Sequence, residues 1–305
     1  MNLDQAVLQL DAAAETSRLR LLVALLGGET TVGDLVAMLQ QSQPRVSRHL
    51  RLLLEAGLVE SFREGRSIYY RWSAAGLAAG VASPVAAVAA SGDPTITADR
   101  ARLQTLSRER ERVALRRALR AGGARGLHQS DTDTGAAISE LVLATPGELR
   151  PGDVLIVGCG SGELLQLLLP AVRMVAGTEP SSHRRQVARA RLRRGGQPHW
   201  TIRDADATRL PFTAASFDLV IVQDALVPGA EIARILGEAA RVLRPAGQLL
   251  ILDRILPTDL GLPACLAALG FTVTNRQWLP GRAPDRALFQ ASRADLTAAR
   301  TGTDD

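Results

Sequence analysis

The chain has 305 residues, of which 46% are hydrophobic, 22% are charged and only 3% are aromatic. That length suffices for about two domains with separate cores, and this balance excludes a disordered or collagen-like chain. The formal net charge is +5 and all 36 basic residues are arginine, which permits contact with nucleic acid but does not require it.

Cysteine usage and hydropathy exclude several further classes of protein. Cys159 and Cys265 are the two cysteines, and neither belongs to a CxxC or Cys/His cluster. A disulfide scaffold and a cysteine-rich metal site are therefore excluded. The acidic N-terminus lacks the basic region of a signal peptide, and no apolar run reaches the ~18 residues of a membrane span. We expect a cytoplasmic protein with no membrane partner.

Composition divides the chain into four segments. Residues 1–75 indicate short helices followed by a hairpin, and residues 76–130 an Ala/Gly-rich linker followed by an arginine-rich helix. Residues 131–295 alternate β-runs with helical stretches, which predicts a doubly wound α/β domain. Residues 296–305 are polar and are expected to be a disordered tail.

The first segment contains two short helices separated by a break. Thr30 or Thr31 can cap the first helix, and Ser42 can cap the second with Pro44 in its first turn. Gly57 is expected to end the second helix. A helix, a tight turn and a second helix are the arrangement that enters the major groove of DNA.

The second helix has two different faces. Val46, Leu50, Leu53 and Leu54 recur at helical spacing and are expected to face the core. The opposite face is polar and basic, and we expect its side chains to contact DNA: Gln43, Arg45, Ser47, Arg48 and His49.

Two β-runs, LVESF and SIYYRW, follow this helix and predict a hairpin with a basic tip. Arg63 and Arg66 at that tip suit phosphate or minor-groove contacts. A basic helical face alone would equally fit a three-helix bundle with a solvated surface. The helix pair, the EAGLV corner and the basic hairpin together favour a winged helix-turn-helix.

Residues 8–73 resemble the ArsR/SmtB family of winged-helix repressors, and SRHLRLLLEAGLVESFREGRSIYY carries the likeness. The resemblance implies a homodimer that binds a double-stranded DNA operator, with the flanking helices at the dimer interface. Metal-sensing members of the family place cysteines in the helix before the turn. This chain reads TTVGDL there, so we expect no metal site.

The third segment opens with the strand VLIVG and the glycine turn GCGSG at residues 158–162. Such a turn brings the backbone close to a ligand and fits either a dinucleotide or S-adenosylmethionine. Glu179 ends the second strand, where a carboxylate can accept hydrogen bonds from a ribose. Asp206 follows the third strand, where a carboxylate can receive an adenine amino group.

Residues 150–255 resemble the class I methyltransferases that depend on S-adenosylmethionine. The likeness lies in GCGSG, the acid after strand two, DATRLPF, SFDLV and ARVLRPAG. It implies a Rossmann-like fold that binds S-adenosylmethionine or S-adenosylhomocysteine. The implied cofactor-binding residues are Gly158, Cys159, Gly160, Gly162, Glu179, Asp206, Ala207 and Gln223. The family commonly has an acid where this chain has Ile156, which predicts weakened binding of the methionine end.

No catalytic residue can be assigned from the sequence. Asp224 is the one candidate in the loop after strand four, and His128 is expected to be structural or exposed. The chain resembles winged-helix proteins fused to methyltransferase-like domains, but it lacks the aromatic residues and the His-containing insertion of their acceptor region. The leading hypothesis is a DNA-binding regulator that senses the nucleoside. The alternative is an active methyltransferase on a small molecule, with the winged helix as an address module.

Two arginine-rich stretches need separate interpretations. Residues 100–125 are expected to form a solvated connector or dimer helix, with DNA-backbone contact as the alternative, and to couple the two domains. The arginines of residues 183–194 are expected to form the solvated face of a helix.

Overall fold

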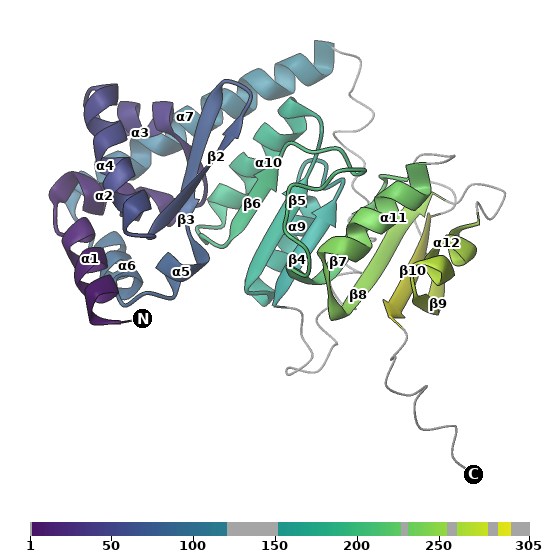
Figure 1. The fold of residues 1–305 in the computed structure, drawn as a ribbon. Coiled ribbons are helices and arrows are strands. Elements are labelled where there is room, and N and C mark those ends of the chain that lie inside the picture. The colour runs from purple at the N-terminus through teal and green to yellow at the C-terminus, as the bar shows by residue number, and fades with distance from the viewer. Residues whose placement is uncertain (1, 121–151, 227–230, 255–260, 280–285, 294–305) are drawn as a thin grey trace. The chain divides into compact units, whose positions relative to one another are not determined.

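The computed structural model describes residues 2–120, 152–226, 231–254, 261–279 and 286–293, and Figure 1 shows their fold. The chain forms two compact units. Unit 1 comprises residues 1–123 and 186–201, and unit 2 comprises residues 124–185 and 202–305. The expected end of the linker at residue 130, the expected tail and His128 lie outside the described residues.

Unit 1 is a winged helix-turn-helix, as predicted. Its three-stranded antiparallel sheet has the order β1-β3-β2, and the register pairs Val59 with Trp72 and Glu64 with Ser67. The elements before the second unit are α1 (Leu3–Ala13), α2 (Thr16–Leu25), β1 (Thr30–Thr31), α3 (Val32–Leu39), α4 (Gln43–Glu55), β2 (Val59–Glu64), β3 (Ser67–Trp72), α5 (Ala74–Leu77), α6 (Ala82–Ala90) and α7 (Pro94–Arg120).

The helix boundaries in unit 1 follow from capping residues. Thr31 is the N-cap of α3, and its Oγ1 accepts a hydrogen bond from the Asp34 backbone N–H at 3.2 Å. Ser42 is the N-cap of α4 and proline stands in its first turn. After α4 the chain turns at Gly57, whose φ of +69° lies in the region that favours glycine.

The core of unit 1 is built from the inner faces of its helices and of β3. Leu21, Leu35 and Leu50 are completely buried in it, and Trp72 donates a hydrogen bond from its indole N–H to a backbone oxygen of α2. Leu103 brings α7 into the same core. The arginine-rich helix therefore packs on the winged helix through part of its length.

Unit 2 contains a seven-stranded sheet with the order β6-β5-β4-β7-β8-β10-β9. The pairs β4–β5, β4–β7 and β7–β8 are parallel, whereas β8–β10 and β10–β9 are antiparallel. The sheet is therefore mostly parallel, with the last two predicted strands added antiparallel at one edge. The elements of the chain from residue 153 onward, of which residues 186–201 belong to unit 1, are β4 (Asp153–Val157), α9 (Glu163–Leu168), the 3-10 helix Leu169–Ala171, β5 (Met174–Thr178), α10 (Ser182–Arg194), β6 (Trp200–Arg203), β7 (Phe217–Gln223), α11 (Glu231–Val242), β8 (Leu243–Arg254), α12 (Leu262–Ala268), β9 (Phe271–Leu279) and β10 (Arg286–Arg293).

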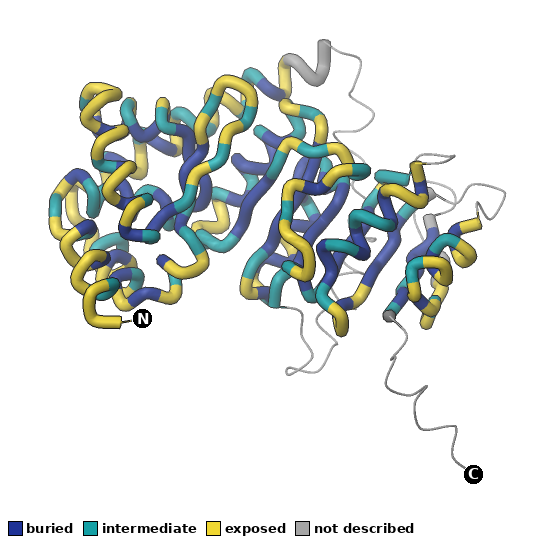
Figure 2. Tube along the Cα trace, in the orientation of Figure 1, coloured by how far each residue is buried: buried dark blue, intermediate teal, exposed yellow. Residues whose placement is uncertain are grey.

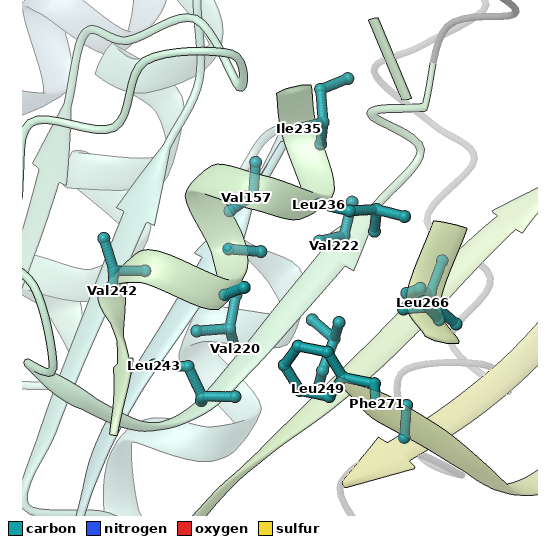
Figure 3. Packing of buried hydrophobic residues seen from close by; sticks show 14 of the residues in the cluster. Val157, Val220, Val222, Ile235, Leu236, Val242, Leu243, Leu249, Leu266 and Phe271 are labelled. Carbon is teal, nitrogen blue, oxygen red and sulfur yellow. The ribbon is translucent and has the colours of Figure 1, made fainter. Parts of the chain in front are cut away.

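Buried aliphatic side chains hold unit 2 together. Val220 and Val222 of β7 lie beside Leu249 of β8, and Ile235 and Leu236 of α11 pack on them (Figure 3). Figure 2 shows these strands as mostly buried. Near-continuous apolar runs are typical of parallel strands covered on both faces. Within the part of the chain that the structure describes, no helix is long and apolar enough to cross a membrane.

Candidate functional site

Helix α4 exposes the polar face that the sequence predicted for DNA. Val46, Leu50 and Leu53 are completely buried on its inner side. The outer side presents four of the five predicted contact residues to solvent: Gln43, Arg45, Ser47 and Arg48. Helix α4 therefore packs on the core with its apolar side and presents a basic side to solvent.

His49 is the exception on this helix, because its side chain is only 13% exposed and lies against Glu15. Its Nδ1 is 3.6 Å from Glu15 Oε2. Glu15 is also the N-cap of α2. Burial raises the pKa of Glu15, but hydrogen bonds from the backbone N–H groups of Arg18 and Ser17 and the charge of His49 lower it, and the net effect is a lowered pKa. His49 thus connects α4 to the cap of α2, a position for which the sequence offered no signal.

The β2–β3 hairpin forms the wing, and Arg63 and Arg66 are exposed at its tip. Gly65 occupies the first position of the two-residue turn with a φ of +57°, and the Arg63 Nε donates to the Gly65 oxygen at 3.1 Å. Below the tip, the rings of Phe62 and Tyr69 stack with their centroids 5.3 Å apart. The wing therefore carries its basic groups on a rigid base.

The glycine turn of unit 2 follows β4. The backbone N–H groups of Gly158 and Cys159 donate to the Thr178 oxygen at 3.0 and 2.9 Å, which fixes the turn against the end of β5. Gly158 has a φ of +79°, and a Cβ there would lie 2.3 Å from the Gln223 oxygen. Only glycine fits a turn that passes so close to the end of β7. The structure thus brings the turn and Gln223 together.

Glu179 is held directly beneath this turn. Its Oε2 accepts a hydrogen bond from the Gly160 N–H at 3.1 Å, and its Oε1 accepts one from the Ser181 N–H at 2.9 Å. The side chain is 5% exposed, and Arg184 lies 4.0 Å from it. The acid predicted to bind ribose and the turn predicted to approach the ligand therefore form one corner.

Asp206 lies in the loop after β6, where it is exposed, and the neighbouring Ala207 is half-buried. The Asp206 Oδ1 accepts hydrogen bonds from the Thr208 N–H at 2.8 Å and from the Thr208 hydroxyl at 2.9 Å. These bonds hold the pKa of Asp206 below its usual range. The carboxylate is therefore charged and fixed in direction by its own loop.

Ile156 is completely buried in β4, between Gly177 of β5 and Ile221 of β7. The position where the resemblance expects an acid is therefore part of the apolar core of this sheet.

Two carboxylates stand at the carboxyl ends of β7 and β8. Asp224 has a φ of +46°, which is unusual for a residue other than glycine, and its N–H donates to the Leu252 oxygen at 2.9 Å. Asp253 Oδ2 accepts from the Leu226 N–H at 2.8 Å. Asp253 was missed at the sequence level, although its place directly after the run LLIL marks it as a strand-end carboxylate.

The expectation of a solvated arginine face over residues 183–194 is wrong for Arg185 and Arg189, whereas Arg194 is exposed as expected. Arg185 and Arg189 are buried. Arg185 donates hydrogen bonds to the backbone oxygen of Glu179 at 2.5 Å and to Asp204 Oδ1 at 3.0 Å. Arg189 forms ion pairs with Glu29 and Glu64. Buried arginine is tolerated because each charge is paired and hydrogen-bonded.

Among the described residues, no three His, Cys, Asp or Glu side chains lie close enough together to hold a metal ion. Cys159 is buried and Cys265 half-buried, and neither of them forms a disulfide.

Two family models match the chain. The model of the bacterial regulatory protein, arsR family, matches residues 15–61, which include α2, α3 and α4. The model of a methyltransferase domain matches residues 155–251, from β4 to β8. The second match supports the expected cofactor, S-adenosylmethionine or S-adenosylhomocysteine.

Individual relatives are similar to one part of the chain or the other. The transcriptional activator HlyU of Vibrio cholerae is 39% identical over 72 residues, which are 24% of this chain and 67% of that protein. The arsenical resistance operon repressor of Escherichia coli is 50% identical over 46 residues, 15% of this chain and 39% of the repressor.

For the second part, the 27-O-demethylrifamycin SV methyltransferase of Amycolatopsis mediterranei is 36% identical over 126 residues, 38% of this chain and 44% of that enzyme. The chain thus spans less than half the length of this enzyme and of the arsenical repressor. It belongs, through its N-terminal part, to the arsR family of bacterial regulatory proteins, and it carries a methyltransferase domain in its C-terminal part.

Proposed function

We propose that the protein is a homodimeric transcriptional regulator whose methyltransferase-like unit binds S-adenosylmethionine or S-adenosylhomocysteine as an effector. The observation that carries the proposal is the exposed face of α4, which presents Arg45 and Arg48 to solvent while the opposite, apolar face of the helix is completely buried. A helix of this kind can enter the major groove, while Arg63 and Arg66 of the wing contact the phosphates. Chromosomal DNA and the nucleoside are both found in the cytoplasm, where we place this function.

The nucleoside site supports the effector role. Glu179 is already oriented by two backbone N–H groups before any ligand arrives. A ribose diol that donates to this carboxylate meets a fixed acceptor, so that little ordering entropy is lost on binding. Asp206 is fixed in the same way for the adenine amino group. Ile156 removes one contact to the methionine end and leaves the nucleoside contacts in place.

A second copy of the chain is the partner we propose for α1. Leu3, Val7 and Leu10 of this helix are 78%, 57% and 59% exposed, and Leu8 is 44% exposed. Contiguous apolar side chains on a surface helix mark an interaction site. A dimer would bury these side chains. It would also position its two α4 helices to contact two DNA half-sites that lie about one helical turn apart.

An active methyltransferase remains the second candidate function, and the strand-end carboxylates favour it. Asp224 holds an unusual backbone conformation, and such conformations gather at functional sites. With Asp253 it could serve as a base for a methyl acceptor placed in line with the sulfonium. The methyltransferase relative from Amycolatopsis shows that a domain of this kind can act on a small molecule.

Calorimetry and DNA titration together test the proposal. Each nucleoside is titrated into the dimer, and a labelled duplex, selected from a random-sequence pool by the protein itself, is titrated at fixed salt with no nucleoside, S-adenosylmethionine or S-adenosylhomocysteine. We expect binding heat and a shift in DNA affinity with at least one nucleoside. Three superimposable DNA curves, together with labelled methyl on a metabolite of a cell extract, would establish the enzyme instead.

A further inference from the structure

His49 interrupts the polar face of α4, because the structure turns its ring inward. The side chain is 13% exposed, although Arg45, Ser47 and Arg48 on the same helix are open to solvent. The two ring nitrogens are buried, and neither has a hydrogen-bond partner among the described residues. Buried polar groups without a partner are rare and costly, so the position of this ring needs a physical reason.

The ring lies against the carboxylate of Glu15, where α2 and α4 pack on each other (Figure 1). His49 Nδ1 is 3.6 Å from Glu15 Oε2, which is close enough for an ion pair but too long for a hydrogen bond. The same oxygen accepts a hydrogen bond from the Arg18 N–H at 2.8 Å and so caps α2. Glu15 is therefore fixed by α2, and it can attract a positively charged ring on α4.

The turn between α3 and α4 is joined to the same carboxylate. Gln41 Nε2 donates a hydrogen bond to Ser17 Oγ at 3.0 Å, and Ser17 donates to Glu15 from its backbone N–H and its hydroxyl. Ser17 is buried, and the Gln41 Oε1 atom is buried without a partner among the described residues. We call Glu15, Ser17, Gln41 and His49 the cap cluster. Through this cluster the N-terminus of α2 contacts both the turn and the helix that we assign to the major groove.

The charged side chains of the elements that pack on α4 show which group faces the ring. These elements are α1, α2, α3 and β2. Apart from Glu15, their described charged side chains are exposed or bonded elsewhere: Asp4, Asp11 and Arg63 are exposed, Arg18 donates to backbone oxygens of α1, and ion pairs join Arg20 to Asp99, Asp34 to Arg110, Glu60 to Arg71 and Glu64 to Arg189. On α4 itself, Arg45 and Arg48 are exposed and Arg51 pairs with Glu55. The charge that acts on the ring at close range is therefore that of Glu15.

Protonation would give the His49 ring the partner that it lacks when neutral. A neutral imidazole has one donor and one acceptor, so one buried nitrogen keeps a lone pair with nothing to accept. The protonated ring has donors at both nitrogens, and its Nδ1–H can close on Glu15 as a charge-assisted hydrogen bond. The pKa of Glu15 is lowered, so its carboxylate stays charged over the interval from about pH 8 to about pH 5 in which imidazole side chains change charge.

The position of His49 also sets the direction of the basic side chains of α4. Arg45 precedes His49 by four residues, which places it about 40° away around a helix of 3.6 residues per turn, and Arg48 is the preceding residue in the chain. Both arginines are exposed. A bond from the ring to the cap of α2 therefore limits rotation of α4 about its axis, and with it the directions in which both arginines can point.

We propose that His49 is a positioning residue for DNA binding, whose protonated ring pairs with Glu15 and fixes α4 against α2. This inference rests on the proposed function and differs from the direct DNA contact that the sequence predicts for His49. If DNA binds the paired state more tightly than the unpaired state, binding takes up protons, and by linkage the DNA affinity rises as the pH falls.

The test measures DNA affinity from about pH 8 to about pH 5 in four proteins: wild type, His49→Gln, Glu15→Gln and His183→Gln. His49→Gln keeps a polar side chain that cannot become charged. Glu15→Gln keeps an oxygen that can cap α2 and removes the negative charge. His183→Gln is the matched control, since it makes the same chemical change at a half-buried ring in unit 2. The probe is the selected duplex described above, at fixed salt and without nucleoside.

We expect the DNA affinity of the wild type to rise roughly two- to fivefold over this interval, or about 0.4–1 kcal/mol at tenfold per 1.4 kcal/mol, which is the range of a partly exposed ion pair. The rise should remain in His183→Gln and disappear in His49→Gln and Glu15→Gln. A purely structural His49 would leave the pH dependence unchanged in His49→Gln, and a His49 that contacts DNA directly would leave it unchanged in Glu15→Gln. A full rise in either variant of the cap cluster would overturn the inference.

Proton uptake supplies a second readout. The heat of DNA binding is measured in the middle of the pH interval in two buffers with different ionisation enthalpies, and the difference gives the number of protons taken up. We expect uptake in the wild type and in His183→Gln and none in the two variants of the cap cluster. If His49→Gln fails to fold, Glu15→Gln carries the same test.

The wild type separates failure of this inference from failure of the proposed function. A wild type that binds the duplex with neither a rise in affinity nor proton uptake would refute the role of His49 and leave DNA binding standing. A wild type that binds no duplex at any pH would refute the proposed function itself.

Discussion

Replacing Glu179 with alanine removes the acceptor that we assign to the ribose. A hydrogen bond to a charged group contributes about 1.5–3 kcal/mol. At tenfold per 1.4 kcal/mol, its loss should raise the dissociation constant of S-adenosylhomocysteine roughly 10- to 150-fold. The same change leaves the Gly160 and Ser181 N–H groups without their carboxylate. Both can turn to water in a partly exposed turn, so the cost in unfolding free energy should be near the lower end of ~1–3 kcal/mol.

Isothermal titration calorimetry measures the binding, and thermal unfolding measures the stability. Glu179→Gln separates the two roles, because the amide oxygen can still accept one backbone N–H while the charge is lost. Glu231→Ala is the control, since it removes an equal charge from an exposed position at the start of α11. A folded Glu179→Ala protein that binds S-adenosylhomocysteine with wild-type affinity would show that the acid does not hold the ribose.

Further predictions concern the DNA face and the pocket. Arg48→Ala should weaken the free energy of binding to a specific DNA site by about 1–3 kcal/mol if Arg48 contacts a base edge. Arg66→Ala should weaken binding to all DNA sequences and reduce the salt dependence of the affinity. Filter binding at several salt concentrations measures both effects. Thr208→Val should raise the pKa of Asp206, measured by carboxyl NMR, toward its usual value. Because the folded pKa is depressed, the wild-type carboxylate should stay charged below that usual value and lose its ligand contact only as the pH falls through the lower pKa. Ile156→Asp should tighten binding of S-adenosylmethionine in calorimetry yet lower the melting temperature, since position 156 is completely buried.

The helix-turn-helix could be predicted from the sequence because its signals are local. Val46, Leu50 and Leu53 repeat with the period of a helix, and each is buried as that period requires. Thr31 and Ser42 stand at N-caps for reasons that involve only neighbouring backbone N–H groups. The basic residues of the outer face follow from the same period.

The meeting of the glycine turn with Glu179 could be predicted for a topological reason. The carboxyl ends of β4 and β5 meet at one edge because neighbouring parallel strands place those ends together. A glycine turn after the first strand and an acid after the second must therefore lie close, as Gly160 and Glu179 do. What the pattern could not supply is that the acid binds the turn itself.

Pairings between distant residues were decided by the tertiary structure alone. Composition predicted a solvated face for the arginines of α10, yet Arg189 is buried on Glu29, a residue 160 positions away in the chain. His49 has the polar spacing of a DNA contact, but its ring lies against Glu15. An arginine or histidine has the same helical period whether it faces water or a carboxylate. Only the packed structure determines which of the two it meets, because the charge partner comes from another part of the chain.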